Sequence, residues 1–109
     1  MPTTRASFLL RIRPDRLEEY LEAHQHVWAD MREALERSGW HNYSLFLHRS
    51  SCLVVGYVET DDFDEAQRRM AAEDVNTRWQ AAMADFFEPV DDGVRPGQSV
   101  DLEEYFHLA

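Results

Sequence analysis

Residues 40–60 read WHNYSLFLHRSSCLVVGYVET, two apolar runs separated by a short polar segment. The runs, residues 40–48 and 52–60, have the length of strands and are rich in β-branched and aromatic residues. Residues 49–51 (RSS) lie between them and favour a turn. This pattern predicts two antiparallel strands joined as a hairpin. The segments on either side of the hairpin then determine how the sheet is completed and covered.

Upstream of the hairpin, the sequence predicts a third strand and one long helix. Residues 5–13 (RASFLLRIR) alternate between apolar and polar side chains, as a half-buried strand does. Asp15 marks a helix start, with Glu18 in the capping-box position. Apolar residues then recur at a three-four spacing, so a single helix is expected over 15–38. Gly39 is the expected stop.

Downstream of the hairpin, two more helical stretches and a last strand are expected. A short helix begins after two aspartates, 61–62, and a second begins at about Asp74 and ends before Pro89. Residues 89–101 contain two prolines and two glycines and are expected to form a loop. Residues 102–108 (LEEYFHL) are predicted to form the final strand.

The order strand, helix, strand, strand, helix, strand (βαββαβ) predicts an α+β fold of the ferredoxin-like, split βαβ type. Helices would cover one face of an antiparallel sheet. The length of 109 residues suits one domain over 1–109. By analogy with other small domains of this kind, the second face is expected to enclose a pocket or to pack on another copy.

Charge and cysteine content exclude several classes of function. There are 21 acidic against 11 basic residues, a formal net charge of -10. Such a surface disfavours a partner with a phosphate backbone and an anionic membrane, and suits a neutral small molecule. Cys52 is the only cysteine, so neither an internal disulfide nor a cysteine-rich metal site is expected. With no run resembling a signal peptide or a membrane span, a cytoplasmic location is expected.

His24 is the first candidate for chemistry, because it interrupts the apolar stripe of the predicted long helix. Tyr20, His24 and Trp28 are spaced i, i+4, i+8 and would share one face. One interpretation is a core histidine bonded to a backbone carbonyl. The other is a general acid/base in an aromatic pocket, a role that suits an unperturbed pKa of about 6.5.

Two aromatic residues are further candidates. Tyr43 shares a strand face with Leu45 and Leu47, so it either packs or donates a hydrogen bond into a pocket. Trp79 lies on the apolar face of the last helix, where it packs in the core or covers the C–H face of a sugar. Motifs for a zinc protease, a nucleotide-binding loop or a nucleophile elbow are absent from the sequence.

Four segments, in order, resemble the L-rhamnose mutarotase family, which also includes L-fucose mutarotase-like members. They are YLEAH (20–24) followed by Trp28, GWHNYSL (39–45), DVNTRW (74–79) followed by Met83, and LEEYFHL (102–108). Each motif alone is weak, but the four in the right order cover nearly the whole chain. One departure is Gln80, which stands where the family often has a second tryptophan.

The resemblance implies a dimeric α+β barrel without cofactor or metal that interconverts the α and β anomers of a 6-deoxy-hexose, with L-rhamnose the first expectation. It implies a proton donor at His24. It also implies that Tyr20, Tyr43 and Trp79 bind the sugar. Gln80, which replaces the second tryptophan, is expected to bind the sugar through a hydrogen bond instead of stacking. Further residues of the pocket wall are expected at Trp28, Arg78 and Asn42.

Three alternatives stay open from the sequence. The substrate could be L-fucose instead of L-rhamnose, since the two differ only in hydroxyl stereochemistry. The same scaffold also carries cofactor-free monooxygenases and haem-binding proteins. A non-catalytic, dimeric sugar-binding module is the third alternative. Oxygen consumption or a coloured haem complex would identify the second class, and sugar binding without anomer exchange the third.

Overall fold

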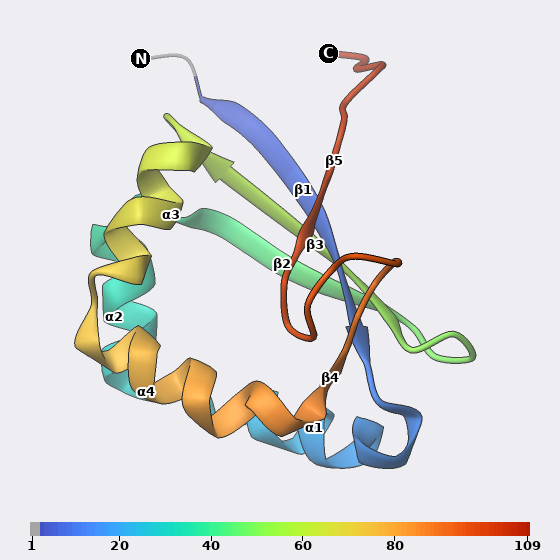
Figure 1. Cartoon of the computed structure of the whole chain (residues 1–109). Helices are drawn as coiled ribbons and strands as arrows, with labels where there is room; N and C mark the ends of the chain where they lie inside the picture. The colour runs from blue at the N-terminus through green and yellow to red at the C-terminus, as the bar shows by residue number, and fades with distance from the viewer. Residues whose placement is uncertain (1–2) are drawn as a thin grey trace.

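An antiparallel sheet forms one layer of the molecule and α-helices form the other (Figure 1). The computed structural model describes residues 3–109. Within them the elements are β1 (Thr4–Ile12), the 3-10 turn η1 (Pro14–Arg16), α1 (Leu17–His24), α2 (Ala29–Arg37), β2 (His41–His48), β3 (Leu53–Thr60), α3 (Phe63–Ala71), α4 (Asp74–Met83), the 3-10 turn η2 (Ala84–Phe86), β4 (Phe87–Glu88) and β5 (Val100–Leu102).

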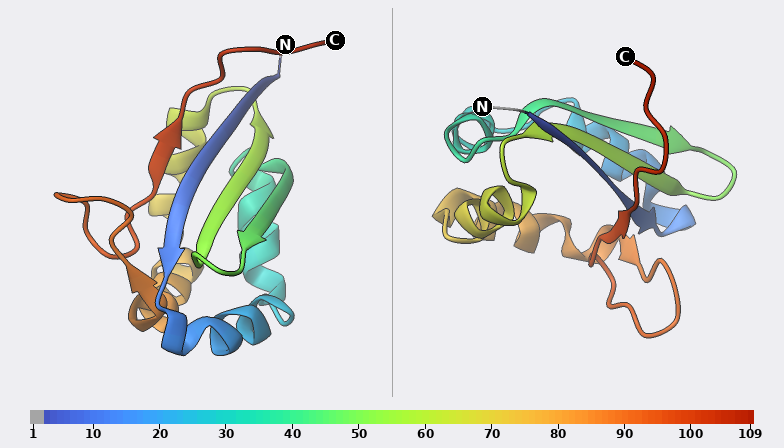
Figure 2. Two further views of the ribbon diagram at one scale, coloured as in Figure 1. Left: turned by 90° about the vertical axis from the view of Figure 1, so that its right-hand side faces the viewer. Right: turned by 90° about the horizontal axis from the view of Figure 1, so that it is seen from above.

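The sheet has the order β2-β3-β1-β4, with β5 also paired to β1. β2 and β3 form the predicted hairpin, and β3 pairs along nearly the whole of β1. Seen from the right of Figure 1, the helices lie behind the sheet (Figure 2). The predicted α+β, ferredoxin-like fold with helices on one face is therefore confirmed.

The prediction of one helix over 15–38 is wrong, because the chain leaves the helix between His24 and Ala29. A straight helix of that length would be about 36 Å long, whereas the nine-residue strand β1 spans about 30 Å. The break lets both halves pack against the same sheet: α1 buries Leu17 and Tyr20, and α2 runs in another direction along α4 (Figure 1).

The predicted capping box also does not form. Asp15 lies in η1, ahead of α1, and its carboxylate accepts a hydrogen bond from Arg13 at 2.8 Å. α1 begins without a side-chain cap. The caps expected elsewhere are confirmed: Asp62 accepts from the backbone N–H of Glu65 at 3.1 Å, and Gly39 follows α2 with φ at 92°.

The predicted final strand at 102–108 is shifted in the structure. The edge of β1 is occupied by two short strands, β4 and β5, with a loop between them. In β5, Leu102 pairs with Ser7, and Glu104 next contacts Arg5 through an ion pair of 2.8 Å. By this register Tyr105 would lie opposite Thr4, the first residue of β1, so the residues after Tyr105 extend past that strand. Residues 103–109, here called the C-terminal tail, form no regular element.

The inner face of the sheet is made by alternate residues of β1 and β3. Every second residue of β3 from Val54 to Thr60 is buried, and Gly56 lies opposite Phe8 of β1. A Cβ atom at Gly56 would lie 2.2 Å from Cζ of Phe8, so the absence of a side chain there makes room for the aromatic ring. Within residues 3–109 no helix is long and apolar enough to cross a membrane.

Candidate active site

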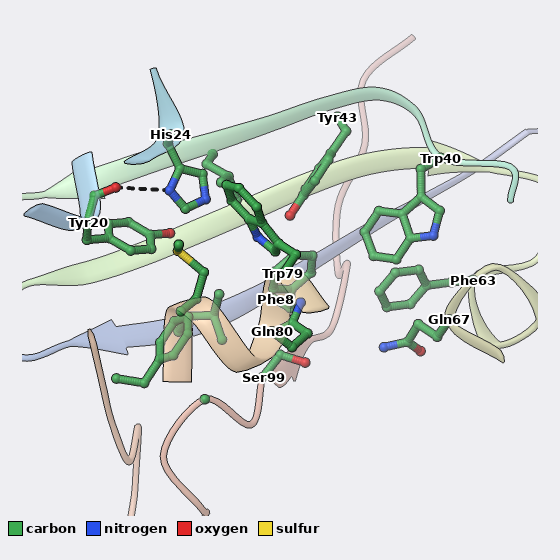
Figure 3. Close-up of a pocket in the computed structure, with 15 residues that line it drawn as sticks. Phe8, Tyr20, His24, Trp40, Tyr43, Phe63, Gln67, Trp79, Gln80 and Ser99 are labelled. Carbon is green, nitrogen blue, oxygen red and sulfur yellow. Dashed lines mark hydrogen bonds between the residues drawn. The ribbon is translucent and has the colours of Figure 1, made fainter. Parts of the chain in front are cut away.

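A cavity lies between the inner face of the sheet and the helices (Figure 3). Its inner part has a volume of about 180 Å³ and its outer part, toward α2, about 730 Å³. The two parts share a set of lining residues: His24, Trp40, Tyr43, Leu45, Gln67, Trp79 and Gln80. The inner part, lined largely by aromatic rings with a few polar groups, has the character of a small-molecule site.

His24 is the last residue of α1 and lines both parts of the cavity. Its Nδ1 lies 3.1 Å from the carbonyl oxygen of Tyr20, so this nitrogen carries the proton in the neutral ring and donates it. Nε2 is then the basic nitrogen, and Figure 3 shows it pointing into the cavity. Burial lowers the pKa of His24, while the bond to the carbonyl partly opposes the shift. The imidazole is therefore neutral at pH 7.

Both interpretations of His24 from the sequence describe part of this arrangement. The backbone hydrogen bond expected of a core histidine is present, and it orients a ring that also faces the cavity. One nitrogen is held by the helix and the other is left for a ligand. This is how a positioned base is built.

Two phenol hydroxyls accompany the imidazole. Tyr20 is only 3% exposed, and its ring centroid lies 4.3 Å from that of His24. Tyr43 enters from β2, with its ring 5.0 Å from Trp40. Burial raises the pKa of Tyr20 to about 12 and the pKa of Tyr43 further still. Both phenols therefore stay protonated and can donate hydrogen bonds to a ligand.

Trp79 of α4 forms a wall beside the histidine. It is 6% exposed, and its ring meets His24 edge-on at 5.5 Å. Trp28, expected as a wall residue, lines neither part of the cavity and packs edge-on against Trp79, with ring centroids 5.0 Å apart. Arg78 also points elsewhere, forming ion pairs with Asp30 and Asp74. Both residues support Trp79 and α4.

The remaining two expected residues, Gln80 and Asn42, both line the cavity. Gln80 is an exposed residue overall, but part of its side chain lines both parts of the cavity. Its amide nitrogen donates a hydrogen bond to Oδ1 of Asn76 at 3.2 Å. Asn42 lines only the outer part, and its amide donates to Glu59 at 2.9 Å.

Comparison with known proteins identifies the family. Residues 5–108 match the family model described as L-rhamnose mutarotase. The L-rhamnose mutarotases of Bacillus subtilis and Oceanobacillus iheyensis are 35% and 33% identical to this chain, each alignment covering 95% of it and 97% of the relative. The chain belongs to the L-rhamnose mutarotase family. The crystal structure of an L-rhamnose mutarotase from Formosa agariphila, 21% identical, has the same fold, with a TM-score of 0.79 over 97% of this chain and 99% of that one.

As a member of the L-rhamnose mutarotase family, the chain is an isomerase of the aldose 1-epimerase type. Its inner cavity matches a neutral substrate. The titratable residues that line it are His24, Tyr20 and Tyr43, all uncharged at neutral pH. The first charged residues, Arg32 and Glu36, line the outer part.

Several lining residues of this mutarotase-family chain were not predicted from the sequence. Trp40 and Phe63 form an aromatic wall, with rings 5.6 Å apart, and Phe8 stacks on Phe63 at 6.1 Å. Gln67 of α3 and Ser99 of the last loop add polar groups. The periodicity of the sequence could have identified Gln67, because this residue lies on the same helical face as Phe63 and Met70. It is a polar residue in an apolar stripe, as His24 is.

Proposed function

We propose that this protein interconverts the α and β anomers of a 6-deoxy-hexose, with L-rhamnose as the main substrate. The observation that carries the proposal is the orientation of His24: Nδ1 bonds to the helix backbone and Nε2 faces a neutral, aromatic cavity. The family of the chain and the names of its relatives support the choice of sugar.

The reaction requires one proton to move between two oxygens bonded to the same carbon. In the proposed mechanism Nε2 of neutral His24 takes the proton from the anomeric hydroxyl, and the resulting imidazolium gives a proton to the ring oxygen. The bond between C1 and the ring oxygen breaks, and the anomeric carbon becomes an aldehyde. Rotation about C1–C2 followed by the reverse transfers yields the other anomer. His24 is thus base and proton donor within one cycle.

The other lining residues would hold the sugar during these transfers. The hydroxyls of Tyr20 and Tyr43 would donate to sugar oxygens, and Trp79 would pack against C–H groups. Gln80 would bind a hydroxyl at the mouth through the amide oxygen that its bond to Asn76 leaves free.

We also propose that the active form is a homodimer and that the enzyme is cytoplasmic. The C-terminal tail supports the first proposal, because Tyr105, Phe106 and Leu108 are 94%, 73% and 81% exposed. Apolar side chains that extend from a sheet edge in this way are typical of a surface that a partner covers. The second copy of this chain is the partner proposed.

Anomer exchange measured by NMR tests the function. Saturation transfer between the α and β H1 signals would be followed for L-rhamnose, L-fucose and D-glucose, with wild type, His24→Ala and His26→Ala. His26 is a matched control, because it is exposed and its partner among residues 3–109 is Glu22 on the surface of α1. We expect exchange with L-rhamnose to fall by about 10²–10⁴-fold in His24→Ala and to persist in His26→Ala.

The other outcomes separate the alternatives. Faster exchange with L-fucose than with L-rhamnose would identify an L-fucose mutarotase. A folded, active His24→Ala variant would remove the histidine from the mechanism. Binding without exchange of any of the three sugars would favour the sugar-binding module, and neither binding nor exchange would call for haem titration and oxygen-consumption measurements.

A further inference from the structure

Gln67 occupies the end of the cavity opposite His24. In Figure 3, His24 and Tyr20 lie at one end, and Gln67 lies with Trp40 and Phe63 at the other. Gln67 is half-buried and lines both the inner and the outer part. Its position on α3 is fixed by Ala66 and Met70, which are buried on the same helix.

The amide of Gln67 is available to a ligand. Within residues 3–109 it forms no side-chain hydrogen bond, whereas the amide of Gln80 is held by Asn76. The side chain is half-buried, so a ligand that fills the cavity would displace water from this amide, and a hydrogen bond to the ligand would offset that loss. The amide carries both a donor and an acceptor, so it can bind two neighbouring hydroxyls at once.

The geometry of a pyranose indicates which hydroxyls reach this end. If C1 and the ring oxygen lie at His24, the ring atoms across from them are C4 and C3. In L-rhamnose the hydroxyls on these two carbons are equatorial neighbours at the edge of the ring. Inverting C4 turns its hydroxyl from the edge toward a face of the ring, which would carry it away from the amide of Gln67.

We propose that Gln67 is a specificity-determining residue that binds the C3 and C4 hydroxyls of the sugar and selects the configuration at C4. This inference rests on the proposed function of the same site. It adds a residue and a stereochemical criterion that the histidine mechanism does not require.

The test removes the amide and the sugar hydroxyl separately and together. The substrates are L-rhamnose, 4-deoxy-L-rhamnose and 6-deoxy-L-talose, the C4 epimer of L-rhamnose. The variants are Gln67→Met, which keeps the length of the side chain, and the control Gln25→Met, an exposed residue just after α1. The quantities measured are kcat/KM and KM for anomer exchange, with circular dichroism to verify folding.

Wild type is expected to prefer L-rhamnose over the other two sugars. Gln67→Met should raise KM for L-rhamnose about tenfold and reduce the preference over 6-deoxy-L-talose. It should raise KM for 4-deoxy-L-rhamnose clearly less, because only the contact with the C3 hydroxyl is then lost. A packing role would not produce this dependence on one hydroxyl. Gln25→Met should behave as wild type.

Two results would overturn the inference while leaving the proposed function intact. One is equal loss of activity on L-rhamnose and 4-deoxy-L-rhamnose in Gln67→Met. The other is a wild-type enzyme with equal kcat/KM for L-rhamnose and 4-deoxy-L-rhamnose. That result does not depend on whether the variant folds. Absence of exchange with every sugar in wild type would instead contradict the proposed function itself.

Discussion

Nδ1 of His24 lies 3.1 Å from the carbonyl oxygen of Tyr20, one turn earlier in α1. The carbonyl of Tyr20 belongs to the last turns of the helix, so the imidazole is held by the backbone of its own element. This bond fixes both the tautomer and the direction of the imidazole. The same histidine that ends α1 thereby presents Nε2 to the cavity (Figure 3).

The first prediction concerns pH. Burial is the main cause that lowers the pKa of His24 below its usual 6.5, and the proposed mechanism begins with the neutral ring. The rate of exchange should therefore be constant above pH 6.5 and fall as the pH drops through the lowered pKa of the folded protein.

The measurement is kcat/KM for anomer exchange between pH 4.5 and 8, corrected for the uncatalysed rate, together with NMR titration of the His24 ring. The two midpoints should agree and lie below 6.5. A rate that rises on acidification through this range would mean that protonated His24 is the form that binds the sugar.

The second prediction concerns the two phenols. Tyr20→Phe and Tyr43→Phe remove hydroxyl groups whose pKa shifts arise mainly from burial, with no contribution from a hydrogen bond to the protein. Each change should lower kcat/KM by about tenfold, the equivalent of one neutral hydrogen bond to substrate. The free energy of unfolding should change by less than about 0.5 kcal/mol.

Thermal or urea unfolding and exchange kinetics, measured on the same samples, provide the comparison. Tyr57→Phe is a useful contrast, because the Tyr57 hydroxyl donates to Glu59 at 2.7 Å on the outer side of the sheet. It should leave exchange unaffected. A large loss of stability in Tyr20→Phe would show that its hydroxyl serves the fold and not the ligand.

The third prediction concerns Gly56 and Phe8. An alanine at Gly56 would bring Cβ to 2.2 Å from Cζ of Phe8, a contact that requires the ring to move. Gly56→Ala should destabilise the fold by about 1–3 kcal/mol. It should also lower exchange, because Phe8 lines the inner cavity.

A double-mutant cycle with Phe8→Leu separates the steric effect from any intrinsic cost of the alanine. The smaller side chain should relieve the clash, so the two changes together should destabilise less than their sum, with a coupling of about 1 kcal/mol or more. Additive effects would mean that the ring of Phe8 is not what Gly56 accommodates.

The local patterns of the sequence were enough to predict most of the fold. The alternation of apolar and polar residues in 5–13 and the two apolar runs in 40–60 predicted three strands correctly, because each pattern reflects burial of one face of the sheet. The break after His24 could not be predicted in this way. The three-four spacing continues on both sides of it, and only the limited length of the sheet requires the helix to turn.

The site was predicted unevenly for a related reason. His24, Tyr20 and Trp79 were found because two lie on one helix and the family motifs contain all three. Trp40 and Phe63 belong to separate elements, and their meeting depends on packing of α3 against the start of β2. Gln67 was not predicted although it interrupts an apolar stripe, the criterion that identified His24.

The last prediction concerns the C-terminal tail, whose three large apolar side chains point into solvent in the single chain. If the tail packs on a second copy, each buried side chain contributes about 1.5–3 kcal/mol, and the same contact occurs twice in a symmetric dimer. Replacing Tyr105, Phe106 and Leu108 by serine should therefore convert the dimer into a monomer, as measured by light scattering at micromolar concentration.

Glu103→Ser, a polar change in the same tail, should leave the dimer intact. A monomeric wild type would contradict the proposed dimer, and a triple variant that stays dimeric would move the interface to another surface, such as the outer side of β2 around Phe46, which is 62% exposed.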